Sequence, residues 1–132
     1  MPDQGLLIPG LEPTLRVMPM PADMNGNGDI FGGWVMAQCD IAAAIPAMRR
    51  ARGRITTVAV NSFLFKQPIS VGDIVSFYAE VVEVGRTSIT VDVQVFAERH
   101  PADPLVVKVT EAQFTYVAIN EDGGKREVPA AK

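Results

Sequence analysis

The sequence contains one segment that can form a long helix, and this segment is apolar almost all the way round. It extends from about residue 33 to residue 48 and follows a glycine-rich loop at residues 25 to 29. A helix that is apolar on nearly all sides is expected to be buried. Everything after residue 54 resembles strands, which would supply the covering surface. Pro46 is expected to kink or interrupt the helix, because it cannot donate to the carbonyl of Ala42.

One carboxylate interrupts the apolar helix. At about 100° per residue, Asp40 shares its face with small, mostly apolar residues and with no Lys or Arg. A carboxylate in such surroundings is costly unless it is hydrogen-bonded or paired. We therefore predict that Asp40 is a base or a nucleophile near the apolar core. The alternative is an aspartate turned outward by local packing.

The loop before the helix is built from residues that tolerate positive φ angles and hydrogen-bond to the nearby backbone. Gly32 and Gly33 then allow another group to approach the backbone where the helix begins. The free N–H groups of a helix start can hold an anion or polarise a carbonyl. A plain capping loop would explain the same composition. Asp29 is predicted to cap the helix or brace the loop.

The rest of the chain has the pattern of an antiparallel sheet. Strands are expected at residues 13 to 20, 56 to 66, 74 to 84, 88 to 98 and 105 to 119. From residue 88 to residue 98 the apolar residues alternate, as in a sheet with one face on the core. The last four strands are predicted to form a meander. The predicted fold class is α+β: a hotdog, in which a curved antiparallel sheet wraps around one long central helix.

Length and composition exclude several classes of protein. The chain of 132 residues predicts a single domain at residues 13 to 119, with a loose arm at 1 to 12 and a polar tail at 120 to 132 that frays. The net charge of −3 argues against a nucleic-acid partner. One cysteine excludes a disulfide framework. No membrane span or signal peptide is recognisable, so a cytoplasmic location is expected.

Other catalytic and metal sites find little support. Residues 23 to 28 match the opening of an EF-hand loop, but Trp34 stands where a bidentate glutamate is needed. Cys39 adjoins Asp40, but a Cys–His or Ser–His–Asp mechanism needs a histidine beside the nucleophile. The only histidine, His100, is expected in a distant loop. A hotdog dehydratase would also need a histidine near the helix. No Cys/His cluster suits a metal, and none is expected.

Several segments closely resemble the YciA-type acyl-CoA thioesterases, hotdog hydrolases that release CoA from fatty acyl thioesters. The most specific segment is Asn-x-Asn-Gly-Asp-Ile-Phe-Gly-Gly-Trp at residues 25 to 34. Weaker matches lie at residues 53 to 60, 65 to 73, 84 to 88 and 110 to 118, so the resemblance spans about residues 14 to 129. It implies a hydrolase of fatty acid metabolism without a cofactor, since CoA is part of the substrate and product. Pro46 and Ala42–Ala43 depart from a helix richer in Gly and Leu, which could alter the acyl pocket.

The resemblance also implies roles for single residues. Asp40 matches the catalytic carboxylate, which activates water or attacks the thioester. Asn25 matches an asparagine that faces this carboxylate across a dimer interface. The N–H groups of Gly32 and Gly33 resemble the oxyanion site for the thioester carbonyl.

The segment Arg86, Thr87 and Ser88 resembles the hairpin that meets the phosphates of CoA, which a guanidinium and hydroxyls would suit. A surface β-turn is the alternative reading of these residues. Members of the family assemble as dimers, often as trimers of dimers, so a homo-oligomer is expected.

Two hypotheses for the function remain. The first is an acyl-CoA thioesterase that uses Asp40. The second is a hotdog that binds acyl-CoA without cleaving it, as a sensor or buffer. Only the first explains a carboxylate at Asp40 on an apolar helix opposite Asn25.

Overall fold

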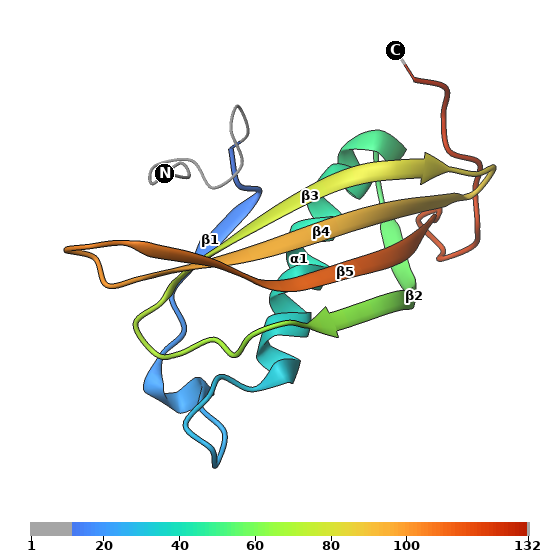
Figure 1. Ribbon diagram of the computed structural model, residues 1–132. Helices are drawn as coiled ribbons and strands as arrows, with labels where there is room; N and C mark the ends of the chain where they lie inside the picture. The colour runs from blue at the N-terminus through green and yellow to red at the C-terminus, as the bar shows by residue number, and fades with distance from the viewer. Residues whose placement is uncertain (1–11, 132) are drawn as a thin grey trace.

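The protein consists of one long helix packed against a curved five-stranded antiparallel sheet (Figure 1). The computed structural model describes residues 12–131. A turn of 3-10 helix (Pro21–Asp23) precedes helix α1 (Gly32–Ala51). The strands are β1 (Leu15–Val17), β2 (Ile55–Phe65), β3 (Ile74–Val84), β4 (Ser88–Arg99) and β5 (Leu105–Ala118). This arrangement confirms the predicted α+β hotdog architecture.

The four long strands begin and end within one residue of their predicted bounds. In β4 the predicted alternation is confirmed, since Ile89, Val91, Val93, Val95 and Ala97 are all buried. A strand turns successive side chains to opposite faces, so these five residues lie on the face that packs against the core. The first predicted strand is shorter than expected and forms only the three residues of β1.

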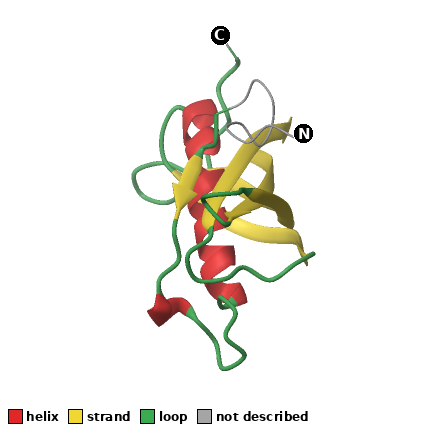
Figure 2. Ribbon diagram, turned by 60° about the vertical axis from the view of Figure 1, so that its left-hand side comes forward, coloured by secondary structure: helices red, strands yellow, loops and turns green. Residues whose placement is uncertain are grey.

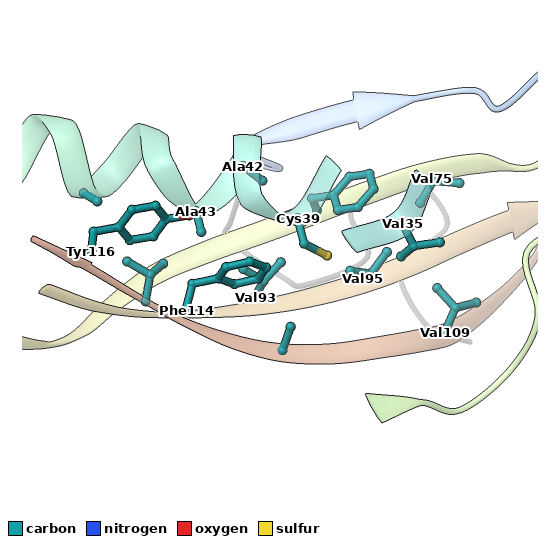
Figure 3. Packing of buried hydrophobic residues seen from close by; sticks show 14 of the residues in the cluster. Val35, Cys39, Ala42, Ala43, Val75, Val93, Val95, Val109, Phe114 and Tyr116 are labelled. Atoms are coloured by element: carbon teal, nitrogen blue, oxygen red, sulfur yellow. The ribbon is translucent and has the colours of Figure 1, made fainter. Parts of the chain in front are cut away.

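The hydrophobic core lies between the sheet and α1. Figure 3 shows side chains of β3, β4 and β5 meeting those of the helix. The largest fully buried side chains of the core include Tyr116, Phe77 and Phe114. The helix contributes Val35 and the small residues Cys39, Ala42, Ala43, Ala47 and Ala51. Small residues let the helix backbone approach the sheet closely.

The prediction of a helix buried on all sides is wrong for the single chain. Figure 2 shows the sheet on one side of α1, and Ile41 and Met48 on the helix are 52% and 45% exposed. The predicted interruption at Pro46 is also wrong, because the helix continues to Ala51. The packing of α1 on the sheet compensates for the one missing N–H. No helix within residues 12–131 is long and apolar enough to cross a membrane.

Strand β2 does not lie where a meander would place it. The sheet order is β1-β3-β4-β5-β2, so β3, β4 and β5 form a meander while β2 pairs with β5 at the far edge. The connection from β2 to β3 therefore passes from one edge of the sheet to the other side of β4. As a result, β2 is a long edge strand, and no other strand within residues 12–131 pairs with its outer side (Figure 1).

The C-terminal tail is tied to the domain rather than frayed. The Val128 N–H donates to the carbonyl of Arg86, and the Arg126 N–H donates to the carbonyl of Ala118. Arg50 donates to the carbonyl of Pro129, which joins the tail to the end of α1. The predicted arm at residues 1 to 12 lies outside the described residues, except for its last residue.

Candidate functional site

Two hydroxyl groups converge on the carboxylate of Asp40. The Thr57 hydroxyl donates to Asp40 Oδ1 at 3.0 Å. The Tyr116 hydroxyl lies 2.7 Å from the same Oδ1 and 2.9 Å from the backbone carbonyl oxygen of Asp40. Within residues 12–131, no hydrogen bond to Asp40 Oδ2 is formed. The two hydroxyls therefore hold the carboxylate by Oδ1 and leave Oδ2 available to another molecule.

The sheet places these two hydroxyls side by side. Thr57 on β2 and Tyr116 on β5 are direct partners in the antiparallel ladder, and α1 passes over them with Asp40 on its third turn. Tyr116 is 1% exposed, and its ring stacks with that of Phe114 at a centroid distance of 6.3 Å (Figure 3). The position of the Tyr116 hydroxyl is thus fixed by packing.

The protonation state of Tyr116 follows from its surroundings. Burial, and then its hydrogen bond to Asp40, raise the pKa of the Tyr116 hydroxyl above its ordinary value. The hydroxyl therefore keeps its proton at neutral pH and acts as a donor to Asp40. Among the ion pairs of residues 12–131, none involves Asp40, so hydroxyls and not a cation stabilise its charge.

The start of α1 has no side-chain cap. Its N-cap residue is Phe31, whose side chain has no hydrogen-bond acceptor, and no acidic residue lies in the first turn. Of the two roles predicted for Asp29, helix capping is excluded, whereas its position agrees with bracing of the loop. Asp29 belongs to the loop, where its N–H donates to Asn25 Oδ1 at 3.2 Å. In the described part of the chain, the N–H groups of Gly32 and Gly33 donate to no protein acceptor.

Asn25 braces the loop in the single chain. Its Oδ1 accepts hydrogen bonds from the N–H groups of Asn27 at 2.8 Å and of Asp29. A turn of this kind holds the loop in one conformation. It leaves the side-chain amide N–H₂ group of Asn25 able to donate elsewhere.

A cavity of about 370 Å³ opens beside the helix start. It is lined by Asn25, Asp29, Ile30, Gly32, Val35, Phe65, Lys66, Gln67, Pro68 and Ile69. The cavity thus joins two predicted site residues, Asn25 and Gly32, to an apolar wall. A larger cavity of about 580 Å³ is lined by residues of the sheet, such as Tyr78 and Gln113, and by none of the predicted site residues.

The predicted residues form two groups that one chain keeps apart. Asp40 follows Gly33 by seven residues, which is about 10 Å along the axis of an α-helix. The N–H groups of the first turn point along the axis, away from Asp40. An oxygen bound to them would therefore lie even further from the carboxylate. Asp40 and the helix start cannot contact the same carbonyl group within one chain.

The predicted CoA hairpin lies at the Asp40 end of the sheet. Arg86 and Thr87 lie in the turn between β3 and β4, and Ser88 begins β4. The next residue, Ile89, pairs with Tyr116 in the ladder. The Arg86 guanidinium lies 3.7 Å from the carboxylate of Glu127, and both side chains are well exposed. An exposed pair of this kind contributes little to stability, so a phosphate group can compete for the arginine.

Cys39 is unsuited to act as a nucleophile. It is fully buried, and burial raises the pKa of its thiol to about 12, with a further contribution from the neighbouring Asp40 carboxylate. His100 is exposed in the loop between β4 and β5. Within residues 12–131, no group of three or more His, Cys, Asp or Glu side chains is placed to hold a metal.

We expect Cys39 to resist alkylation in the native protein. At pH 8 the thiolate, which is the reactive form, is scarce when the pKa is raised to about 12. Iodoacetamide labelling followed by mass spectrometry should give no adduct in buffer and full labelling in concentrated urea. Above the ordinary thiol pKa of 9.0, Cys39 keeps its proton in the folded protein but loses it in the unfolded chain. The thiol therefore lowers the free energy of unfolding as the pH rises beyond that value. Rapid labelling without urea would contradict the burial of Cys39.

Sequence reasoning assigned no role to Thr57 or Tyr116. Both lie in segments that carry the family resemblance, at residues 53 to 60 and 110 to 118. Their residue types are common in strands, so neither stands out in the pattern. Only the pairing of β2 with β5 brings them to Asp40.

The chain is similar to known thioesterases over most of its length. The family model described as "Thioesterase superfamily" matches residues 27–102. The acyl-CoA thioester hydrolase YciA of Salmonella typhimurium is 47% identical over 120 residues, which cover 89% of this chain and 90% of that protein. A hexameric thioesterase from Yersinia pestis has a similar structure, with a TM-score of 0.85, 44% identity, and coverage of 94% of this chain and 100% of that one. A hexameric hotdog-fold thioesterase of Campylobacter jejuni gives a TM-score of 0.86 with 40% identity, covering 96% of this chain and 92% of that one.

Proposed function

Because this chain belongs to the thioesterase superfamily, we propose that it is an acyl-CoA thioesterase, which converts fatty acyl-CoA and water to a free acid and CoA. The observation that carries this proposal is the carboxylate of Asp40, which two hydroxyls hold on an otherwise apolar helix. Asp40 is half-buried, and an acid held in a fixed geometry beside the core is typical of a catalytic group. No cofactor takes part in the proposed reaction, since CoA belongs to the substrate and the product.

Asp40 is the proposed catalytic carboxylate. With Oδ1 occupied by the hydroxyls of Thr57 and Tyr116, Oδ2 is the oxygen that meets the substrate. It either takes a proton from water, whose oxygen then attacks the carbonyl carbon, or attacks that carbon itself. In both routes the carbon–sulfur bond breaks and the sulfur leaves with CoA. In the second route the acyl group remains on Asp40 as an anhydride, which water then hydrolyses to release the free acid and restore the carboxylate. Thr57 and Tyr116 are positioning residues in this scheme.

The start of α1 is the proposed oxyanion site. As the thioester is attacked, its carbonyl oxygen gains negative charge, and donors about 2.7–3.1 Å from that oxygen stabilise it. The N–H groups of Gly32 and Gly33 are available for this purpose, and the positive end of the helix dipole adds to them. The amide of Asn25 lines the same cavity and is proposed to orient the water or the carbonyl.

A complete site requires two copies of the chain. Asp40 and the helix start of one chain are too far apart to share a substrate, so we propose that each site combines Asp40 of one protomer with Asn25, Gly32 and Gly33 of another. Strand β2 offers the means of assembly, because it has one free edge and exposes Val58 and Leu64. Uncovered edges of this length promote association.

The geometry of β2 explains how pairing would complete the site. Thr57 near one end of the strand contacts Asp40, whereas Phe65 at the other end contacts Gly32 at the helix start. Two β2 strands paired antiparallel about a two-fold axis bring the Thr57 end of each next to the Phe65 end of the other. Two complete sites result. Similar proteins form hexamers, so we propose a trimer of such dimers.

The hairpin of Arg86, Thr87 and Ser88 is the proposed contact for the phosphates of CoA. It lies at the Asp40 end of the sheet, near the proposed reacting atoms. A guanidinium recognises phosphate oxygens well. The single cysteine suits a reducing compartment, and the cytoplasm remains the predicted location.

The alternative function is that of a module which binds acyl-CoA without cleaving it. The 47% identical relative is named a hydrolase, and the geometry at Asp40 has no evident purpose in a binding module. The two functions are separated by measuring CoA release from a panel of acyl-CoAs, with a thiol reagent as the detector. We expect steady turnover with at least one substrate. Binding by calorimetry without any release of CoA would support the module instead.

A further inference from the structure

The aromatic ring of Phe65 lies directly on the first residue of α1. A Cβ atom placed on Gly32 would lie 3.0 Å from Phe65 Cζ, which is closer than an unstrained contact normally allows. The absence of a side chain at residue 32 therefore allows the ring to sit where it does. This close approach links the last residue of β2 to the helix start.

Phe65 also forms one wall of the cavity at the helix start. Three other apolar lining residues, Ile30, Val35 and Ile69, are 5%, 2% and 3% exposed and belong to the core, whereas the smaller Pro68 is exposed. The three core residues form a fixed floor. Phe65 is 54% exposed, so it is the one large apolar wall of the cavity that the core does not enclose.

The ring is also supported by aromatic neighbours on the sheet. Its centroid is 4.8 Å from that of Phe63, which in turn meets Phe114 edge-on at 6.4 Å. Such aromatic contacts hold the ring against the sheet. Both the ring and Gly32, on which it lies, line the cavity.

We propose that Phe65, seated on Gly32, limits the length of the acyl chain that the protein accepts. The inference rests on the proposed function, since it takes the helix start as the position of the thioester carbonyl. An acyl chain attached to that carbonyl extends into the adjacent apolar space, which Phe65 closes.

The test compares Phe65→Ala, Phe65→Trp and a matched control, Leu64→Ala. Leu64 is the preceding residue on β2, is equally exposed at 54%, and lines the other cavity. We measure kcat/KM for acetyl-, butyryl-, hexanoyl-, octanoyl- and palmitoyl-CoA. Phe65→Ala should raise the ratio of long-chain to short-chain kcat/KM by about 10-fold or more, because one methylene in a fitted pocket can already change selectivity by that factor. Phe65→Trp should lower this ratio, and Leu64→Ala should leave it unchanged.

A second measurement separates this inference from the proposed function. Non-hydrolysable thioether analogues of the same chain lengths are titrated into each variant by calorimetry. If the native protein binds them but hydrolyses no acyl-CoA, the proposed function is wrong, while a length preference in binding that shifts in Phe65→Ala still supports the inference. If hydrolysis occurs but Phe65→Ala alters every substrate by the same factor, or matches Leu64→Ala, then Phe65 does not limit chain length and the inference is overturned.

Discussion

Replacing Asp40 with asparagine is expected to lower kcat for acyl-CoA hydrolysis by about 10²- to 10⁴-fold, the contribution of a well-placed general base. Asparagine has the same shape, and its amide oxygen can still accept the hydroxyl protons of Thr57 and Tyr116. The variant should therefore fold and assemble like the native protein. It loses the second carboxylate oxygen, which we propose takes the proton from water or attacks the thioester. The measurement is steady-state CoA release, with circular dichroism and size-exclusion chromatography to verify fold and assembly.

Tyr116→Phe provides a graded comparison for this experiment. It removes one hydroxyl and keeps the ring that stacks on Phe114. Asp40 remains in place but is held less firmly, so we expect kcat to fall by about 10-fold, well short of the effect of Asp40→Asn. A correctly assembled Asp40→Asn protein with native turnover would exclude Asp40 as the catalytic group.

The parts of the fold that could be predicted depend on local periodicity. Strand-forming residues bounded by turn residues located the long strands to within one residue, and alternation with period two predicted the burial along β4. The cost of burying a charge singled out Asp40, which does lie among small apolar residues with hydroxyl partners. In both cases the information is contained in neighbouring residues of the chain.

The parts that could not be predicted depend on contacts between distant segments. Periodicity tells which face of β2 is apolar but not which strand is its neighbour, so the meander was a wrong expectation. The roles of Thr57 and Tyr116 were missed for the same reason. The tail was expected to fray because its residues are polar, whereas its backbone finds partners at Arg86 and Ala118.

Mixing two inactive variants is expected to restore activity, since each proposed site takes its residues from two chains. One parent is Asp40→Asn. The other is Gly33→Pro, which removes an N–H from the proposed oxyanion site. Proline is tolerated in the first turn of a helix, no atom lies within 4 Å of a Cβ at residue 33, and the preceding Gly32 has no Cβ to clash. Loss of one oxyanion donor should cost about 10²- to 10³-fold in kcat.

In a mixed dimer, the Gly33→Pro chain supplies an intact Asp40 and the Asp40→Asn chain supplies an intact helix start. One of the two sites is then complete, and since half of the dimers from random pairing are mixed, about a quarter of the native activity should return. The chains carry different affinity tags and are co-expressed, so that mixed assemblies can be isolated. Gly33→Ala, which keeps the N–H, is the control for the backbone position and should retain far more activity than Gly33→Pro. If isolated mixed assemblies show only the summed activity of their parents, the catalytic groups do not come from different chains. The distance along α1 would then require that either Asp40 or the helix start takes no part in the reaction.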